Sequence, residues 1–384
     1  MTGYAPRVLY LSGPVEPPWT RSDKNLVRGV AANLRHYRAR VLTHEGAVGV
    51  DPRVETEPAW GPRIGGHTPL GRRIGLFNRL LATGDVQLVH LFWPADLLVA
   101  SVVRLGCRMR GLPVVHTLVR APRTTVGIRS ATAGQPLVCL SRETADRLRA
   151  EGLEDVILIP PGIQLGEAIP AARHRAIRER YAIPHGLPIV IYAGDYRHTN
   201  AARTVAATIP RILREIDCHL VLACRIRDDK DRDEAALIKE AIAADGLARK
   251  VTFLGEVKSL RELFAIASVQ VFPADSHHEK MDLPMVLLEG MASGLATVVA
   301  NKPPLEELVE AGAAIGVPSM APVALAVAVV ELLRDPARMQ ALGERGRKVV
   351  SERFDIRTIA ARYETLYDNV LGVHRPRDGA VTRP

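Results

Sequence analysis

The sequence predicts an α/β protein with two doubly wound, Rossmann-like domains, and three observations support this. Short apolar runs alternate with helical stretches along nearly all of the 384 residues, a pattern typical of parallel sheets covered by helices. The length suffices for two domains that each bury a core. The run from Val156 to Ile163 contains Pro160, Pro161 and Gly162, and a charged segment follows it. We therefore expect a domain boundary near residue 165.

The first domain is predicted over residues 1–165. Strands are expected at 7–12, 39–43, 86–92, 112–118 and 136–141, and helices at 25–34, 96–110 and 142–151. Residues 50–72 are rich in Pro, Gly and Arg and predict a long connection, whereas residues 71–81 predict a basic helix with an apolar face. Open α/β sheets bind ligands at the carboxyl ends of their strands. The loop after the first strand is therefore a candidate binding segment, with Trp19, Arg21, Asp23 and Lys24 as candidates and a solvated loop as the alternative.

The second domain is predicted over residues 166–355. Strands are expected at 187–194, 219–223, 251–255 and 269–273, and helices at 201–215, 233–244, 259–267, 325–333 and 336–352. Residues 356–384 are predicted to form a last helix, over 356–371, that reaches back to the first domain, followed by a tail.

Residues 282–300 predict a helix, a glycine stop and a strand. Asp282 is a suitable N-cap, and Pro284 is favoured in the first turn of a helix. Gly294 can end the helix in a left-handed conformation, and the apolar residues 296–300 are typical of a buried strand. Unpaired N–H groups at the helix start would attract an anion. Glu289 follows Asp282 by seven positions and so lies on the same face two turns along. A nucleotide could place phosphate at the helix start and ribose on this carboxylate. A capped core helix with a buried, paired glutamate is the alternative.

The segment from Pro284 to Ala300 resembles the donor-binding segment of family-4 retaining glycosyltransferases, which have the GT-B fold. The resemblance spans nearly the whole chain and is strongest over 187–365. It implies two Rossmann-like domains facing each other across a cleft, with a nucleotide-diphosphate sugar as co-substrate, no cofactor and no required metal. In that family two glutamates frame the helix, and the second binds the ribose. Glu289 corresponds to the second, whereas Met281 stands in the place of the first.

The chain departs from the family pattern at further positions. In the family an arginine and a lysine after the glycine corresponding to Gly194 hold the diphosphate, but this chain has Asp195 and Asn200 there. The family's active-site histidine corresponds to Val119, so that group is absent. We expect other residues to compensate, although each candidate cation could be an ordinary surface residue and His116 could be a satisfied core histidine. The predicted catalytic residues are Lys280, Arg197 and His116; the predicted donor-binding residues are Glu289, Asp282, Glu279, Leu283, Pro284, Met285, Gly194, Arg225 and Val257; the predicted acceptor-binding residues are Gly13, Trp19, Arg21 and Lys24.

Composition and short motifs restrict the remaining classes. The net charge of +9 favours anionic partners, but an aromatic content of 4% argues against a single-strand nucleic-acid binder. The four cysteines, in apolar surroundings and without a C-x-x-C pair, predict reduced core thiols. The Asp-x-Asp triplets within 229–233 predict a solvated loop and no metal site. The N-terminus has no apolar signal core, and no apolar run approaches the roughly 18 residues of a spanning helix. We therefore expect a cytoplasmic protein.

The sequence thus favours a retaining glycosyltransferase acting on a small-molecule or natural-product acceptor. A lipid-linked envelope acceptor is an alternative, because the basic stretches 28–40 and 71–81 could contact an anionic membrane surface. A second alternative is a non-catalytic GT-B partner or activator, which the missing family residues suggest. Epimerisation or phosphorolysis on the same scaffold is a third. No recognised motif supports nucleic-acid binding.

Overall fold

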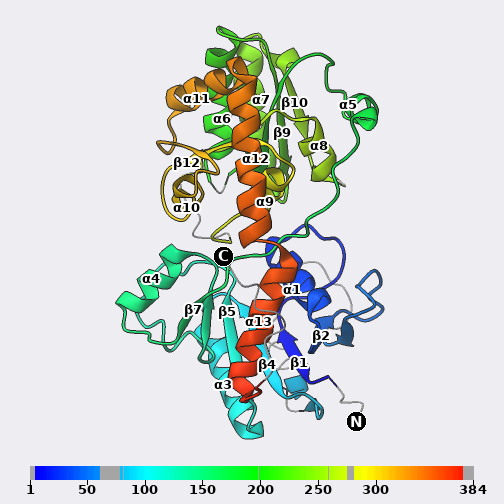
Figure 1. Cartoon of the computed structure of the whole chain (residues 1–384), viewed down its shortest axis with the longest axis vertical. Coiled ribbons are helices and arrows are strands. Elements are labelled where there is room, and N and C mark those ends of the chain that lie inside the picture. Colours follow the sequence, from blue (N-terminus) through cyan, green and yellow to red (C-terminus); the bar gives the residue numbers. More distant parts are fainter. Residues whose placement is uncertain are drawn as a thin grey trace, which may run out of the picture. The chain divides into compact units, whose positions relative to one another are not determined.

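The computed structural model describes residues 5–60, 78–80, 82–197, 199–257, 259–274 and 281–374. The chain forms two compact units, Met1–Gln164 with Ile356–Pro384, and Leu165–Asp355. Each unit contains a parallel sheet covered by helices (Figure 1). The predicted fold class, two doubly wound α/β sheets, is therefore confirmed.

The first unit contains a seven-stranded sheet with the order β3-β2-β1-β4-β5-β6-β7. Its strands are β1 (Arg7–Leu11), β2 (Arg38–Thr43), β3 (Glu55–Pro58), β4 (Leu88–Trp93), β5 (Val114–Leu118), β6 (Leu137–Cys139) and β7 (Val156–Leu158). The chain runs outward from β1 to β3 and then returns to the other side of β1 with β4. The switch point of this sheet, where open α/β folds bind ligands, therefore lies between β1 and β4.

Strand β3 lies within the stretch that was predicted to be a long connection, so that part of the prediction is wrong. The strand is short and polar, and it pairs along β2 at the edge of the sheet. Glu55 forms ion pairs with Arg7 and Arg40 at 3.0 Å each. Charge pairs with residues of β1 and β2 thus replace the apolar alternation expected of a strand, and no local sequence pattern predicts them.

The helices of the first unit are α1 (Ser22–Asn33), α3 (Leu97–Arg110), α4 (Arg142–Ala150) and α13 (Ile356–Leu371). The last of these packs against α1 (Figure 1). The hydroxyl group of Tyr367 on α13 lies 2.8 Å from the Tyr10 hydroxyl and 2.6 Å from His90 Nδ1. Tyr10 lies on β1 and His90 on β4. The C-terminal helix is therefore joined to the first sheet by buried hydrogen bonds as well as by packing.

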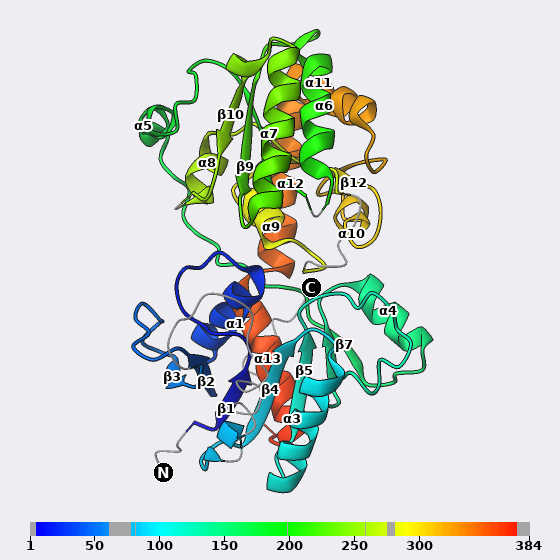
Figure 2. The same cartoon turned by 180° about the vertical axis from the view of Figure 1, so that it is seen from behind.

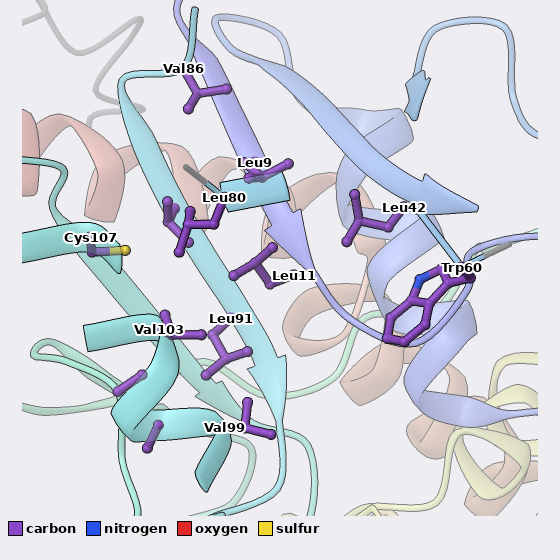
Figure 3. Packing of buried hydrophobic residues seen from close by; sticks show 13 residues of the cluster. Leu9, Leu11, Leu42, Trp60, Leu80, Val86, Leu91, Val99, Val103 and Cys107 are labelled. Atoms are coloured by element: carbon purple, nitrogen blue, oxygen red, sulfur yellow. The ribbon is translucent and has the colours of Figure 1, made fainter. Parts of the chain in front are cut away.

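Figure 3 shows apolar side chains of the first sheet packed against α3. Leu9, Leu42 and Leu91 come from adjacent strands, and Val103 comes from the helix. All four are fully or almost fully buried. Strands covered on both faces read as continuous apolar runs, which is why most of them could be found from the sequence.

The second unit contains a six-stranded sheet with the order β10-β9-β8-β11-β12-β13. Its strands are β8 (Ile189–Asp195), β9 (His219–Arg225), β10 (Val251–Leu254), β11 (Val269–Phe272), β12 (Ala296–Ala300) and β13 (Ile315–Val317). The chain moves outward from β8 to β10 and returns to β11 on the other side of β8. The switch point of this sheet therefore lies between β8 and β11.

Helices cover both faces of the second sheet. They are α5 (His174–Arg180), α6 (Ala201–Leu213), α7 (Asp229–Ala244), α8 (Leu260–Ile266), α9 (Met285–Ala292), α10 (Glu306–Glu310), α11 (Pro322–Arg334) and α12 (Pro336–Arg353). Figure 2 shows α6 and α7 in front of the sheet, whereas α12 lies in front of it in Figure 1. Helix α9 contacts β8, β11 and β12 and packs along α12.

The cysteines and the possible membrane contacts were also predicted from the sequence. The four cysteines are buried free thiols, as predicted. Within the described ranges, no helix is both long and apolar enough to cross a bilayer. The predicted basic helix over 71–81 lies almost entirely outside the described residues.

Candidate functional site

Helix α9 starts later than the sequence predicts. Its first residue is Met285, and Pro284 takes the N-cap position in an extended conformation, with ψ 121° and no side-chain cap. Asp282 precedes the helix and is 1% exposed, so its prediction as the N-cap is wrong. The reason is steric, because a proline ring disfavours helical geometry in the residue before it. Leu283 and Met285 are also buried.

The later start changes the position of Glu289. This residue lies four positions after Met285, just over one turn instead of two, which corresponds to a rise of about 6 Å. Its side chain is half-buried, whereas Leu287, Leu288 and Met291 of the same helix are fully buried. Glu289 is therefore closer to the helix start than predicted and lies on the accessible face. Its contact with a ribose remains a prediction.

A glutamine that the sequence analysis missed fixes α9 to the sheet. Gln270 in β11 is fully buried, and its Nε2 donates to the Val286 carbonyl at 3.2 Å. A Cβ on Gly290 would lie 2.0 Å from Gln270 Oε1, so only glycine allows this close approach. Gly294 has φ +85° and ends the helix in the left-handed conformation, as predicted. The available signal for Gln270 was a polar residue inside the apolar strand Val269–Phe272.

Gly194, at the end of β8, lies at the same edge of the second sheet as α9. Gly194 and Asp195 end β8, and α9 follows β11, which pairs with β8 at the switch point. A Cβ on Gly194 would lie 2.5 Å from the hydroxyl of Tyr192, which donates to the Asp195 carbonyl at 3.1 Å. Val257 follows β10, two strands from β8, and packs against the hydrophobic core. The structure therefore places Gly194 and α9 at one switch point and Val257 at its periphery.

The predicted cation Arg197 belongs to an ion-pair cluster. Its Nη2 lies 2.8 Å from Asp228, and its Nε lies 3.4 Å from Asp231. Arg227, which the sequence analysis did not select, pairs with Asp195 and lies 3.5 Å from Asp231. Asp231 thus holds both guanidinium groups at the carboxyl edge of β8 and β9.

The Asp-x-Asp triplets form the start of α7, so their prediction as a solvated loop is wrong. Asp228 is the N-cap, and its side chain accepts the Asp231 N–H at 2.8 Å. Asp231 is 0% exposed and accepts the Arg227 N–H at 3.1 Å. A carboxylate in the first turn of a helix also benefits from the helix dipole. The charged run is therefore a helix cap with one buried acid.

The remaining predicted cations have separate locations. Arg225 ends β9 and is half-buried. Arg203 on α6, a further cation of this domain that was not among the candidates, pairs with Glu234. Lys280 and Glu279 lie outside the described residues. Three carboxylates and two guanidinium groups in the cluster around Asp231 leave it with a formal charge of −1 (2 − 3). This cluster alone does not supply net positive charge for a diphosphate.

His116 is a core histidine, so its prediction as a catalytic group is wrong. The residue is 1% exposed. Its Nδ1 accepts the Ala133 N–H at 3.1 Å, which places the ring proton on Nε2, and Nε2 donates to the Trp93 carbonyl at 3.0 Å. Burial lowers the pKa of His116 to about 4. Both nitrogens are therefore occupied within the core.

The predicted acceptor-binding residues surround the carboxyl end of β1. Gly13 follows the strand, and no atom of the described residues lies within 4 Å of a Cβ built there. The Trp19 ring is covered by the Arg28 guanidinium at 4.3 Å. Lys24 Nζ donates to the Glu16 carbonyl at 2.9 Å. These contacts order the loop and leave open space at the glycine.

Arg21 in the same loop pairs with a neighbouring acid. Its Nε donates to Asp23 Oδ1 at 3.0 Å. Burial acts to raise the pKa of Asp23, but the Arg21 guanidinium and the Lys24 N–H outweigh it and the pKa is lowered. Over the described ranges, no group of three or more His, Cys, Asp or Glu side chains is arranged to hold a metal ion.

Part of the second unit is similar to a known protein family. Residues 187–335 match the model of the family Glycosyl transferases group 1. The match extends from the start of β8 through α11 and includes Gly194, Asp231 and Glu289.

Individual proteins are also similar to the chain. N-acetyl-alpha-D-glucosaminyl L-malate synthase of Bacillus anthracis is 26% identical over 204 residues, which are 51% of this chain and 49% of the relative. The chain therefore matches about half the length of this curated relative. Sucrose-phosphate synthase of Thermosynechococcus elongatus has a TM-score of 0.76 at 19% identity, over 96% of this chain and 100% of the other. Anabaena HepE in complex with UDP and glucose has a TM-score of 0.76 at 16% identity, over 94% and 99%. The chain has the GT-B fold of these structures.

Proposed function

We propose that the protein transfers a sugar from a nucleotide-diphosphate sugar to the hydroxyl group of a small-molecule acceptor. The family match that includes Glu289 carries this proposal, because the glutamate lies on the accessible face of α9 beside the switch point. The HepE structure contains UDP, which supports a nucleoside diphosphate donor. The Bacillus relative carries L-malate in its name, which supports a small hydroxylated acceptor.

In the proposed reaction the diphosphate departs with the electron pair of the bond to the anomeric carbon. The acceptor hydroxyl oxygen attacks that carbon from the same face, and its proton passes to the departing phosphate oxygen. Glu289 binds the ribose hydroxyls, and the N–H groups at the start of α9 bind phosphate oxygens. Arg225 at the end of β9 provides positive charge at the same sheet edge, and Lys280 is kept as a second predicted cation for the diphosphate. The transfer retains the anomeric configuration and uses neither a metal ion nor a cofactor. NMR of the product's anomeric proton and activity in excess EDTA test these two points.

Nucleoside diphosphates are expected to raise the melting temperature of the protein, and Glu289→Ala is expected to remove about half of that rise. A ligand at 100 times its Kd adds about 2.7 kcal/mol of stability, and a tenfold weaker affinity removes about half of it. A thermal-shift screen with UDP, GDP, ADP and TDP and their sugars measures this. Glu240→Ala, at an exposed position of α7, is the matched control. An equal rise in all three proteins would contradict the ribose contact.

Turnover separates catalysis from binding. The nucleotide sugar with the largest thermal shift is incubated with L-malate as the first acceptor probe, and released nucleoside diphosphate and glycoside are measured. Glycoside formation supports the enzyme. Nucleotide binding without any turnover would favour the non-catalytic partner protein.

A lipid-linked acceptor is a second candidate, favoured by the surface of α3. Leu98, Leu105 and Met109 are exposed, and at 100° per residue they fall on one side of the helix. Arg108 is exposed on the adjoining side. An apolar stripe bordered by arginine is the pattern of a helix that rests on an anionic membrane surface. The basic helix first proposed for this contact, over 71–81, lies almost entirely outside the described residues.

If α3 contacts membranes, the protein is expected to sediment with vesicles that contain phosphatidylglycerol and to be released by high salt. The Leu105→Ser, Met109→Ser double variant should bind several-fold less, because it loses buried apolar area. Val327→Ser, at an exposed valine of α11, is the control. Absence of sedimentation at low salt would leave the small-molecule acceptor as the supported candidate.

A further inference from the structure

A buried carboxylate and a histidine meet at the carboxyl edge of the first sheet. Glu16, in the loop after β1, is 2% exposed. Its Oε1 lies 2.8 Å from His44 Nδ1, and its Oε2 accepts the His44 N–H at 2.9 Å. His44 directly follows β2, and β2 pairs with β1 in parallel, with Tyr10 opposite Val41. Two residues that are 28 positions apart are therefore joined at the edge that holds the acceptor loop.

The contacts around Glu16 determine the orientation of the imidazole. Because an ionised carboxylate only accepts hydrogen bonds, its partner Nδ1 must carry a proton, and in the tautomer with the proton on Nδ1 the Nε2 atom has a lone pair. The loop itself is held by Val15, whose N–H donates to the Leu42 carbonyl at 2.9 Å. Lys24 Nζ donates to the Glu16 carbonyl at 2.9 Å. The dyad is thus supported from both strands.

His44 differs from the core histidines of the same unit. His90 and His116 are buried, and both ring nitrogens of each are hydrogen-bonded. The His44 side chain is 16% exposed, and among the described residues only its Nδ1 takes part in a hydrogen bond. The Glu16 carboxylate therefore fixes Nδ1 of His44, and Nε2 can form a hydrogen bond with a ligand.

We propose that His44 Nε2 binds a hydroxyl group of the acceptor, with Glu16 as its positioning residue. This inference rests on the proposed function. Gly13 leaves open space at the same edge, since no atom in the part of the chain that the structure describes lies within 4 Å of a Cβ built there. A hydroxyl group donates to the imidazole lone pair, and the fixed ring orients the acceptor oxygen. Orientation of a reacting group is one of the main contributions that a protein makes to transfer reactions.

Two variants of the histidine separate ligand binding from a structural role. In His44→Asn the side-chain amide occupies the place of Nδ1 and keeps the hydrogen bond to Glu16, but nothing replaces Nε2. In His44→Gln an amide atom reaches the place of Nε2, but the bond to Glu16 is lost. The measured quantities are the KM of L-malate with the selected nucleotide sugar, the thermal shift by UDP and the melting temperature of each protein.

The KM for L-malate is expected to be about tenfold higher in His44→Asn, because this variant loses one hydrogen bond to the acceptor. The increase is expected to be smaller in His44→Gln. Glu16→Gln should raise this KM with little change in kcat. The UDP shift should be unchanged in all three. An unchanged KM in His44→Asn, the opposite order of the two histidine variants, or no use of L-malate by the wild-type enzyme would overturn the proposal. Loss of the UDP shift in the wild-type protein would instead contradict the proposed function.

Discussion

Replacing Asp231 with alanine is expected to lower the free energy of unfolding by about 3 kcal/mol, because breaking a buried ion pair leaves uncompensated groups. The carboxylate is fully buried between the Arg197 and Arg227 guanidinium groups. It also accepts the Arg227 N–H, which would lose its partner. Urea denaturation followed by circular dichroism measures the change. The effect should be large because one side chain serves both arginines and the first turn of α7.

Asp233→Ala is the matched control, since it removes an exposed aspartate from the same helix. We expect no measurable change in its unfolding midpoint. The nucleotide thermal shift gives a second comparison. If the two arginines help to hold the diphosphate, Asp231→Asn should reduce the UDP shift more than its own loss of stability explains. Equal stability of Asp231→Ala and Asp233→Ala would contradict the structural role of the buried acid.

Gly343→Ala is also expected to lower the free energy of unfolding by about 3 kcal/mol, the upper part of the range for overpacking. A Cβ at this position of α12 would lie 2.0 Å from the Gly294 carbonyl oxygen and 2.9 Å from its carbon. Both are backbone atoms of the left-handed stop that ends α9. Because backbone cannot rotate away as a side chain can, α12 or the end of α9 must shift. The UDP shift should therefore also become smaller.

Gly346→Ala tests the same helix without the clash. Its nearest neighbour would be the Ala313 carbonyl oxygen at 3.3 Å. Alanine is favoured over glycine in a helix by about 0.5–1 kcal/mol, which offsets a mild contact. We expect the melting temperature of Gly346→Ala to stay close to that of the wild type and that of Gly343→Ala to fall clearly below it. Equal melting temperatures of the two variants would show that α12 does not need glycine at 343.

Some elements of the fold have a strong local sequence pattern, and others depend on distant parts of the chain. Elements with a strong local pattern were found from the sequence, as α13 shows with its bounds Ile356–Leu371. The glycine stop at Gly294 and the buried strand Ala296–Ala300 were found in the same way. Strand β13 was missed because it contains three residues, and a segment this short carries too little periodicity to be recognised.

The candidate site was predicted less completely than the fold. The sequence located the edge of the sheet, through Gly194 and α9, because strand ends and helix starts can be read locally. It did not identify Gln270, Arg227 or the position of Asp231, whose roles depend on neighbours from other strands. It assigned a catalytic role to His116, because the sequence of a strand does not show whether the nitrogens of a histidine face a cleft or the core.

The sequence by itself determined the two doubly wound sheets and the helix that carries Glu289. The spacing of apolar residues, and the effect of proline and glycine on the backbone, involve only residues that are close together in the sequence. Only the tertiary structure decided which charged and polar groups meet. Glu16 and His44, or Arg197 and Asp231, are brought together by the parallel pairing of strands that are distant in the sequence. Ion pairing and hydrogen bonding depend on separations of a few ångströms in space, and the folded sheet alone sets those separations.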